Sequence, residues 1–186
     1  MRFILSFFCV LVISSCNKKS GLSINMDCSK EHFLNLETIE DVKKSFVVQF
    51  PEDWKTNLYY DESQSSIYTA DTTKQLTETM LLDITSVNKK ITFDSLFVKK
   101  LKNNLKQDNL EETFSKELIF HHKNAYYTKA IGTKRSFDYQ IAHLFIAIDQ
   151  NNYIHSKIEV YGDSLVNERM CKGLQLIEKI QYLYNE

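Results

Sequence analysis

The sequence predicts an α+β fold in which an antiparallel β-sheet is flanked by helices as an α/β/α sandwich. Strand-like segments, a helix, further strands and a last helix follow one another, and the strand connections are short enough for hairpins. Residues 141–148 are largely apolar at both alternating sets of positions, which predicts a strand buried on both faces. Something must therefore cover each face of the sheet.

The first part of the chain is predominantly strand-like. Residues 31–43 place apolar side chains roughly on one side of a helix, which favours a short helix there. The next strand ends in the sequence Phe-Pro-x-x-Trp, where Pro51 and Trp54 break the pattern. Four strand-like segments are found before the first long helix, at residues 45–50, 57–60, 66–70 and 80–87.

Two amphipathic helices are predicted. Thr92 caps the first, which runs to about Gln107 and carries apolar residues at helical spacing among several lysines. The second spans residues 165–184, with its cap supplied by Asp163 or Ser164. Between the two helices the pattern predicts four strands in close succession, at residues 114–122, 125–134, 139–149 and 153–161.

The Phe50-Pro51-x-x-Trp54 corner, the order of the elements and the final amphipathic helix resemble the PsbP/Mog superfamily over residues 45–184. That superfamily comprises the PsbP subunits of photosystem II, the Ran-binding Mog proteins and envelope lipoproteins of the DcrB type. The resemblance implies an antiparallel sheet flanked by helices, and an accessory or binding role rather than catalysis.

The first sixteen residues have the layout of a secretory signal. Arg2 precedes a short apolar run that is too short to span a bilayer, and the run ends in small residues. Ile13-Ser14-Ser15-Cys16 resembles the lipobox of bacterial lipoproteins, which implies that residues 1–15 are removed and that Cys16 is acylated. The alternative is an ordinary cleaved signal that happens to end in cysteine. Residues 16–44 then form a tether, and residues 45–186 form a single domain.

Two cysteines remain once Cys9 leaves with the signal and Cys16 takes the lipid. Cys28 and Cys171 would lie in a compartment that permits disulfides, and a bridge between them would close most of the chain into one loop. Two free thiols are the alternative, because the spacing by itself fixes no geometry.

Tyrosines occur in two adjacent pairs within predicted strands, and exposed tyrosines are suited to contacting a partner or ligand. If one ring of each pair faces outward, the pairs mark a binding face. The residues concerned are Tyr59, Tyr60, Tyr126 and Tyr127.

A catalytic alternative comes from Gly162-Asp163-Ser164-Leu165, which spells the signature of GDSL hydrolases. In those enzymes the serine precedes most of the catalytic domain and its histidine partner follows late. Here no histidine follows Ser164, and a serine without a base is a poor nucleophile.

The sequence as a whole favours a non-enzymatic envelope lipoprotein that assists another envelope component. The membrane, through the lipid, and a protein of the envelope are its expected partners, and the outer membrane facing the periplasm is its expected location. A formal charge of -1 gives no sign of nucleic-acid binding. No metal or cofactor motif is present in the sequence. A small-molecule or lipid carrier with a pocket between sheet and helix is the alternative.

Overall fold

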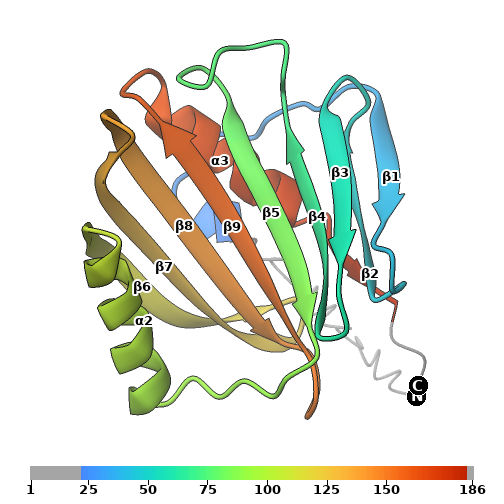
Figure 1. Cartoon of the computed structure of the whole chain (residues 1–186). Helices are drawn as coiled ribbons and strands as arrows, with labels where there is room; N and C mark the ends of the chain where they lie inside the picture. Colours follow the sequence, from blue (N-terminus) through green and yellow to red (C-terminus); the bar gives the residue numbers. More distant parts are fainter. Residues whose placement is uncertain (1–21, 184–186) are drawn as a thin grey trace, which may run out of the picture.

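A seven-stranded antiparallel sheet organises the part of the chain that the structure, a computed structural model, describes, which is residues 22–183 (Figure 1). Its strand order is β3-β4-β5-β9-β8-β7-β6. The strands are β3 (Lys55–Tyr60), β4 (Gln64–Ala70), β5 (Met80–Val87), β6 (Leu110–Phe120), β7 (Lys123–Lys134), β8 (Phe137–Ala147) and β9 (Tyr153–Tyr161). Hairpins join the consecutive strands of this sheet, except β5 and β6. β5 pairs with β9 instead, so a strand from the middle of the chain lies beside its last long strand.

A second, three-stranded sheet packs against the first and has the order β1-β2-β10. Its strands are β1 (Leu36–Glu40), β2 (Phe46–Pro51) and β10 (Gln181–Tyr182). The helix expected over residues 31–43 is therefore wrong: Leu36–Glu40, in the middle of that segment, form β1 and pair with β2. The apolar spacing in this segment favours a helix only weakly. Pairing with β2 gives the backbone N–H and C=O groups of the segment their hydrogen-bond partners, and this decides its conformation.

Two helices cover opposite faces of the large sheet, as the α/β/α prediction requires. α3 (Val166–Ile177) lies behind the sheet in Figure 1 and packs on β9, β5 and β2, whereas α2 (Ser95–Gln107) stands over β6–β8 on the other face. A short helix, α1 (Leu22–Asn25), contacts α3. We call the face that carries α2 the front face. The two-sided burial of β8 is confirmed, with Ile141 and Phe145 at the front and Ala142 and Leu144 behind.

The main core fills the space between the back of the large sheet, α3 and the small sheet. Phe46, Val48 and Phe50 alternate along β2 and are fully buried there. Trp54 is buried as well, and its backbone N–H donates to the carbonyl of Pro51, so the Phe-Pro-x-x-Trp segment is a packed corner. The corner closes the end of the small sheet against α3.

Both predicted helix caps differ from the observed ones. Asp94, not Thr92, caps α2, because its side chain accepts a hydrogen bond from the backbone N–H of Phe97. At α3 neither Asp163 nor Ser164 caps the helix; the residue at the cap is Leu165, in a left-handed conformation. The guanidinium of Arg169 holds this turn instead by donating to the carbonyls of Ser164, Tyr161 and Thr79.

The expected tether is packed against the domain over its described part. Cys28 and Cys171 form a disulfide that joins this segment to α3, with 5.4 Å between their Cα atoms. Beside it, the backbone N–H and hydroxyl of Ser23 donate to the carboxylate of Glu178, and Gln175 bonds the backbone of Ser29. Within residues 22–183 the folded unit therefore begins at α1 rather than at residue 45. Cys16 and the signal segment lie outside the described residues.

Candidate functional site

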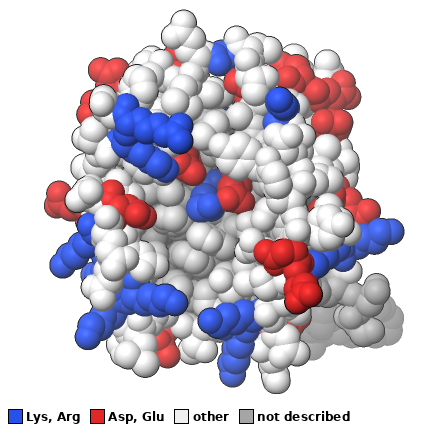
Figure 2. Space-filling model, viewed as in Figure 1, with Lys and Arg blue, Asp and Glu red and all other residues white. Residues whose placement is uncertain are grey.

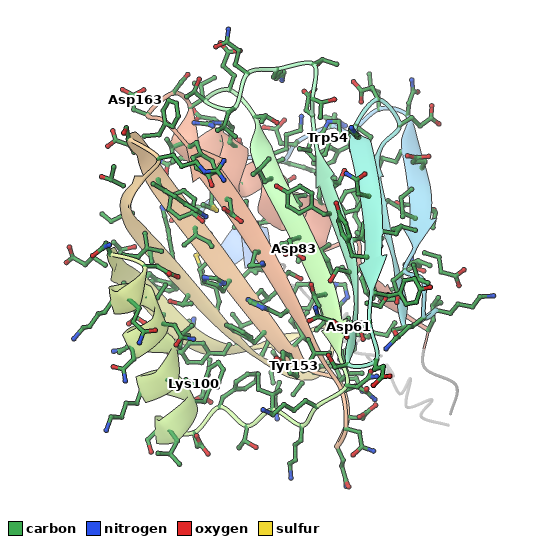
Figure 3. The ribbon with its side chains drawn as sticks, viewed as in Figure 1. Trp54, Asp61, Asp83, Lys100, Tyr153 and Asp163 are labelled. Carbon is green, nitrogen blue, oxygen red and sulfur yellow. A yellow bond between two sulfur atoms is a disulfide. The ribbon has the colours of Figure 1, made fainter. Side chains whose placement is uncertain are left out.

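The front face of the large sheet is covered only in part. α2 lies over β6–β8, and no helix of the described residues covers the fronts of β4, β5 and β9 (Figure 3). β9 presents its alternate residues His155, Lys157 and Glu159 to this face. Lys157 forms an ion pair with Asp83, its register partner on β5. The uncovered face is thus polar, and its central charges neutralise one another.

A groove lies between α2, the loop that precedes it and the front of β8 and β9. It has a volume of about 470 Å³, within the usual range for small-molecule sites. Figure 2 shows a hollow near the middle of this face, with basic side chains, drawn in blue, below it. Three kinds of segment line it: the loop with Lys89, Lys90, Ile91 and Thr92, the helix with Phe97, Lys100, Leu101, Asn104, Leu105 and its C-cap Asp108, and the sheet with His143, Phe145, Tyr153 and His155.

Two histidines form part of the groove floor. The Nδ1 of His143 and the Nε2 of His155 are 3.0 Å apart and share a hydrogen bond, and the ring of Phe145 stacks on His155 at 4.1 Å. Burial lowers the pKa of His143 to about 4, and the positive charge of Lys157 acts in the same direction. Burial lowers the pKa of His155 as well. Both imidazoles are therefore neutral at pH 7, and the floor is polar but uncharged.

A carboxylate with three donors lies farther along the same strand. The Oε2 atom of Glu159 accepts hydrogen bonds from Lys134, Tyr139 and Tyr161, at 3.0, 2.8 and 3.2 Å. Burial would raise the pKa of Glu159, but these hydrogen bonds and the lysine charge lower it below its ordinary value. The group is a satisfied ionic network that holds β7, β8 and β9 together, so we assign it a structural role.

A second depression, of about 610 Å³, lies near the starts of β8 and α3, where Figure 3 labels Asp163. Asp138, Asp163 and Glu111 contribute to its mainly polar lining. Among residues 22–183 no group of three or more histidine, cysteine or acidic side chains is placed to hold a metal ion. The groove beside α2, which combines apolar walls with converging polar groups, is therefore the stronger candidate for a ligand site.

The four tyrosines of the expected binding face do not behave alike. Tyr59 and Tyr60 are 58% and 68% exposed, whereas Tyr126 and Tyr127 are 5% and 2% exposed, so the second pair is wrong as a binding surface. Neighbouring strand residues do point to opposite faces, but β7 is covered on both: Tyr126 packs under α2 and Tyr127 in the main core. Burial raises the pKa of Tyr127 to about 12. β3 is an edge strand, and both of its tyrosines are exposed.

The histidine pair was not foreseen from the sequence, which indicates only a histidine within an apolar strand. A signal does exist in the hairpin register: the turn at residues 148–152 places Phe145 opposite His155 and His143 opposite Lys157. The two histidines are thus diagonal neighbours on one face. Ser164, the residue of the hydrolase alternative, lies in the turn before α3, where its carbonyl oxygen accepts from Arg169.

No helix within residues 22–183 is long and apolar enough to cross a membrane. No protein-family model matches the sequence, and the search of the curated proteins gives no significant match. Solved structures do resemble it. Cyanobacterial PsbP from Synechocystis has a TM-score of 0.57 at 9% identity, over 83% of this chain and 96% of that one. The Ran-binding protein Mog1p of Saccharomyces cerevisiae has a TM-score of 0.55 at 9% identity, over 81% and 96%.

A third similar structure, from Bacteroides thetaiotaomicron, has a TM-score of 0.51 at 12% identity over 82% of this chain. The matched region covers 50% of the length of that protein. At these identities the similarity concerns the fold alone. The similarity to Synechocystis PsbP and to Mog1p therefore shows that this chain has a PsbP/Mog-like fold.

Proposed function

We propose that the protein is a non-catalytic, lipid-anchored accessory protein of the cell envelope that docks a partner polypeptide on the edge strand β3. The observation that carries this proposal is three consecutive exposed apolar residues on that strand: Leu58, Tyr59 and Tyr60, exposed by 44%, 58% and 68%. Large aromatic side chains that stay exposed on a sheet edge are suited to adding a strand from a partner, through backbone hydrogen bonds and side-chain contacts.

The two edges of the large sheet differ in a way that supports this choice. The edge strand β6 has a bulge between Glu112 and Phe114 and carries several charged side chains, which are devices that protect an edge from pairing. β3 pairs with β4 without interruption and carries a single charged residue, Lys55. β3 is thus the less protected edge.

A photocrosslinker at the β3 edge tests the docking proposal. In intact cells, Tyr60→p-benzoylphenylalanine is expected to give one discrete crosslinked adduct, which Tyr59→Ser weakens because it removes a neighbouring contact. The matched control is Ile119→p-benzoylphenylalanine on β6, since the exposed fraction of Ile119, 64%, is similar to that of Tyr60. An equal pattern of adducts from both edges, or none from β3, would contradict the proposal.

The anchoring part of the proposal rests on the Ile-Ser-Ser-Cys sequence at residues 13–16. Cells fed labelled palmitate are expected to incorporate label into the wild-type protein and not into the Cys16→Ser variant, because the thiol that carries the lipid is missing. Each buried methylene of an acyl chain contributes about 0.8 kcal/mol to membrane binding, so the unlabelled variant loses its stable anchor. Cys9→Ser, in the expected signal, serves as the control and keeps the label. Label that survives in the Cys16→Ser variant contradicts the anchor.

The groove beside α2 favours a second candidate function, that of a small-molecule or lipid carrier. A cavity between helix and sheet, with Phe97 and Phe145 in its lining and polar groups at its rim, has the composition of a ligand site. This function needs no catalytic group and is compatible with docking at β3, because the groove and the edge lie on different strands.

A further inference from the structure

The lining of the groove beside α2 carries an excess of positive charge. Lys89, Lys90 and Lys100 contribute to it, against one carboxylate, that of Asp108. All three lysines are exposed, and none forms an ion pair with another residue of the described range 22–183. The nearby Lys157 is already neutralised by Asp83 and contributes little net charge. The rim of the groove therefore has unpaired positive charge.

The lysines and the carboxylate occupy different ends of the groove. Lys89 and Lys90 belong to the loop before α2, and Lys100 lies in the first half of the helix, whereas Asp108 follows its last residue. Figure 3 places Lys100 and Tyr153 toward the lower part of this face, on the side of the loop. An anionic group is therefore attracted to the lysines at the loop end of the groove and repelled by the carboxylate at the opposite end.

The body of the groove is apolar and aromatic. Phe97 packs edge-on against Phe145 at 5.2 Å, and Leu101 and Leu105 continue the same helical stripe. From Phe97 to Leu105 this stripe extends for about 12 Å at the rise of an α-helix. The floor adds His143 and His155, which burial keeps neutral. The floor thus places no charge beneath an apolar chain.

We propose that the groove binds a single-chain anionic amphiphile, namely a long-chain carboxylate, with its head group at the three lysines and its alkyl chain along Phe97, Leu101 and Leu105. The proposal rests on the carrier function above and names its ligand class; it does not depend on docking at β3. Charge complementarity selects the head group, and apolar burial along the helix supplies most of the affinity.

Titration calorimetry of the purified domain at pH 7.4 and low salt, with dodecanoate below its critical micelle concentration, tests the proposal. Dodecanoate is expected to bind, dodecyltrimethylammonium not to bind, and acetate, which lacks the chain, not to bind. Lys89→Gln/Lys90→Gln/Lys100→Gln is expected to weaken dodecanoate binding by about tenfold, since three exposed charge contacts contribute a few tenths to 1 kcal/mol each. The matched control is Lys99→Gln/Lys106→Gln/Lys116→Gln, three exposed lysines outside the groove, which leaves the affinity unchanged.

Each result has a distinct meaning. Neutral dodecyl maltoside binding as tightly as dodecanoate overturns the anionic assignment and leaves the carrier function standing. Equal weakening by the two lysine triples overturns the placement in this groove. If no amphiphile of either charge binds, both the ligand class and the carrier function fall, while docking at β3 is tested separately by the crosslinks.

Discussion

Replacing Cys28 and Cys171 together by serine is expected to lower the free energy of unfolding by about 2–4 kcal/mol. The disulfide joins residues that are 143 positions apart, so its removal releases nearly the whole described chain from one closed loop. Closing a longer loop removes more conformational entropy from the unfolded state. The unfolded state therefore regains a large amount of entropy when such a bridge is removed.

Urea unfolding of the wild type and the double variant measures this effect as a shift of the midpoint. The Cys28→Ser single variant is the control and should unfold at the midpoint of the double variant, because either change removes the same bond. The hydrogen bonds that join Ser23 to Glu178, and Ser29 and Glu31 to Gln175 of α3, remain in all variants. A midpoint that does not move would show that the bridge contributes nothing to stability.

The fold is expected to lose about 3 kcal/mol of stability as the pH falls from 7 to 4, through His143. The pKa of His143 in the folded protein is about 4, against 6.5 for the free side chain, mainly because burial disfavours its charged form. Between these two values the unfolded chain binds a proton that the folded chain rejects. Stability therefore rises with pH across this window and is lost as the pH falls through it.

The groups that face the pair decide the size of this effect. Beside burial, Lys157 lowers the pKa of both histidines, Glu159 raises the pKa of His143, and His143 lowers the pKa of His155. Thermal unfolding between pH 4 and pH 7 measures the slope. His143→Asn/His155→Asn is expected to flatten it, whereas His122→Asn, at an exposed turn between β6 and β7, should retain it. An unchanged slope in the double variant would place the titrating group elsewhere.

The fold class follows from hydrophobic periodicity, and the reason is visible at particular elements. β8 is apolar on both sides because α2 and α3 cover opposite faces of the sheet, and β9 alternates because only its back lies in the main core. The apolar stripe of α2 arises from the spacing of residues close together in the chain, so it can be recognised from the sequence. By contrast, the segment 31–43 has no strong period of its own, and its pairing with β2 decides its conformation.

The candidate site was harder to predict, because the exposure of a side chain is not set by the residues next to it in the sequence. Tyr59-Tyr60 and Tyr126-Tyr127 are the same dipeptide in two strands, yet one pair is exposed and the other buried. The strand order decides this: β3 lies at an edge, and β7 lies under α2. The groove likewise requires that the loop with Lys89 and Lys90 approach β9, which no local pattern encodes.

The amino-acid sequence by itself determined the alternation of strands and helices and the two-sided burial of β8, since these depend on side chains close together in the chain. Only the tertiary structure decided which tyrosines reach solvent, that Cys28 meets Cys171, and that His143 bonds His155 under a lysine-rimmed groove. The physical reason is that burial and proximity arise from strand order and from the layers above and below the sheet, which bring distant segments together.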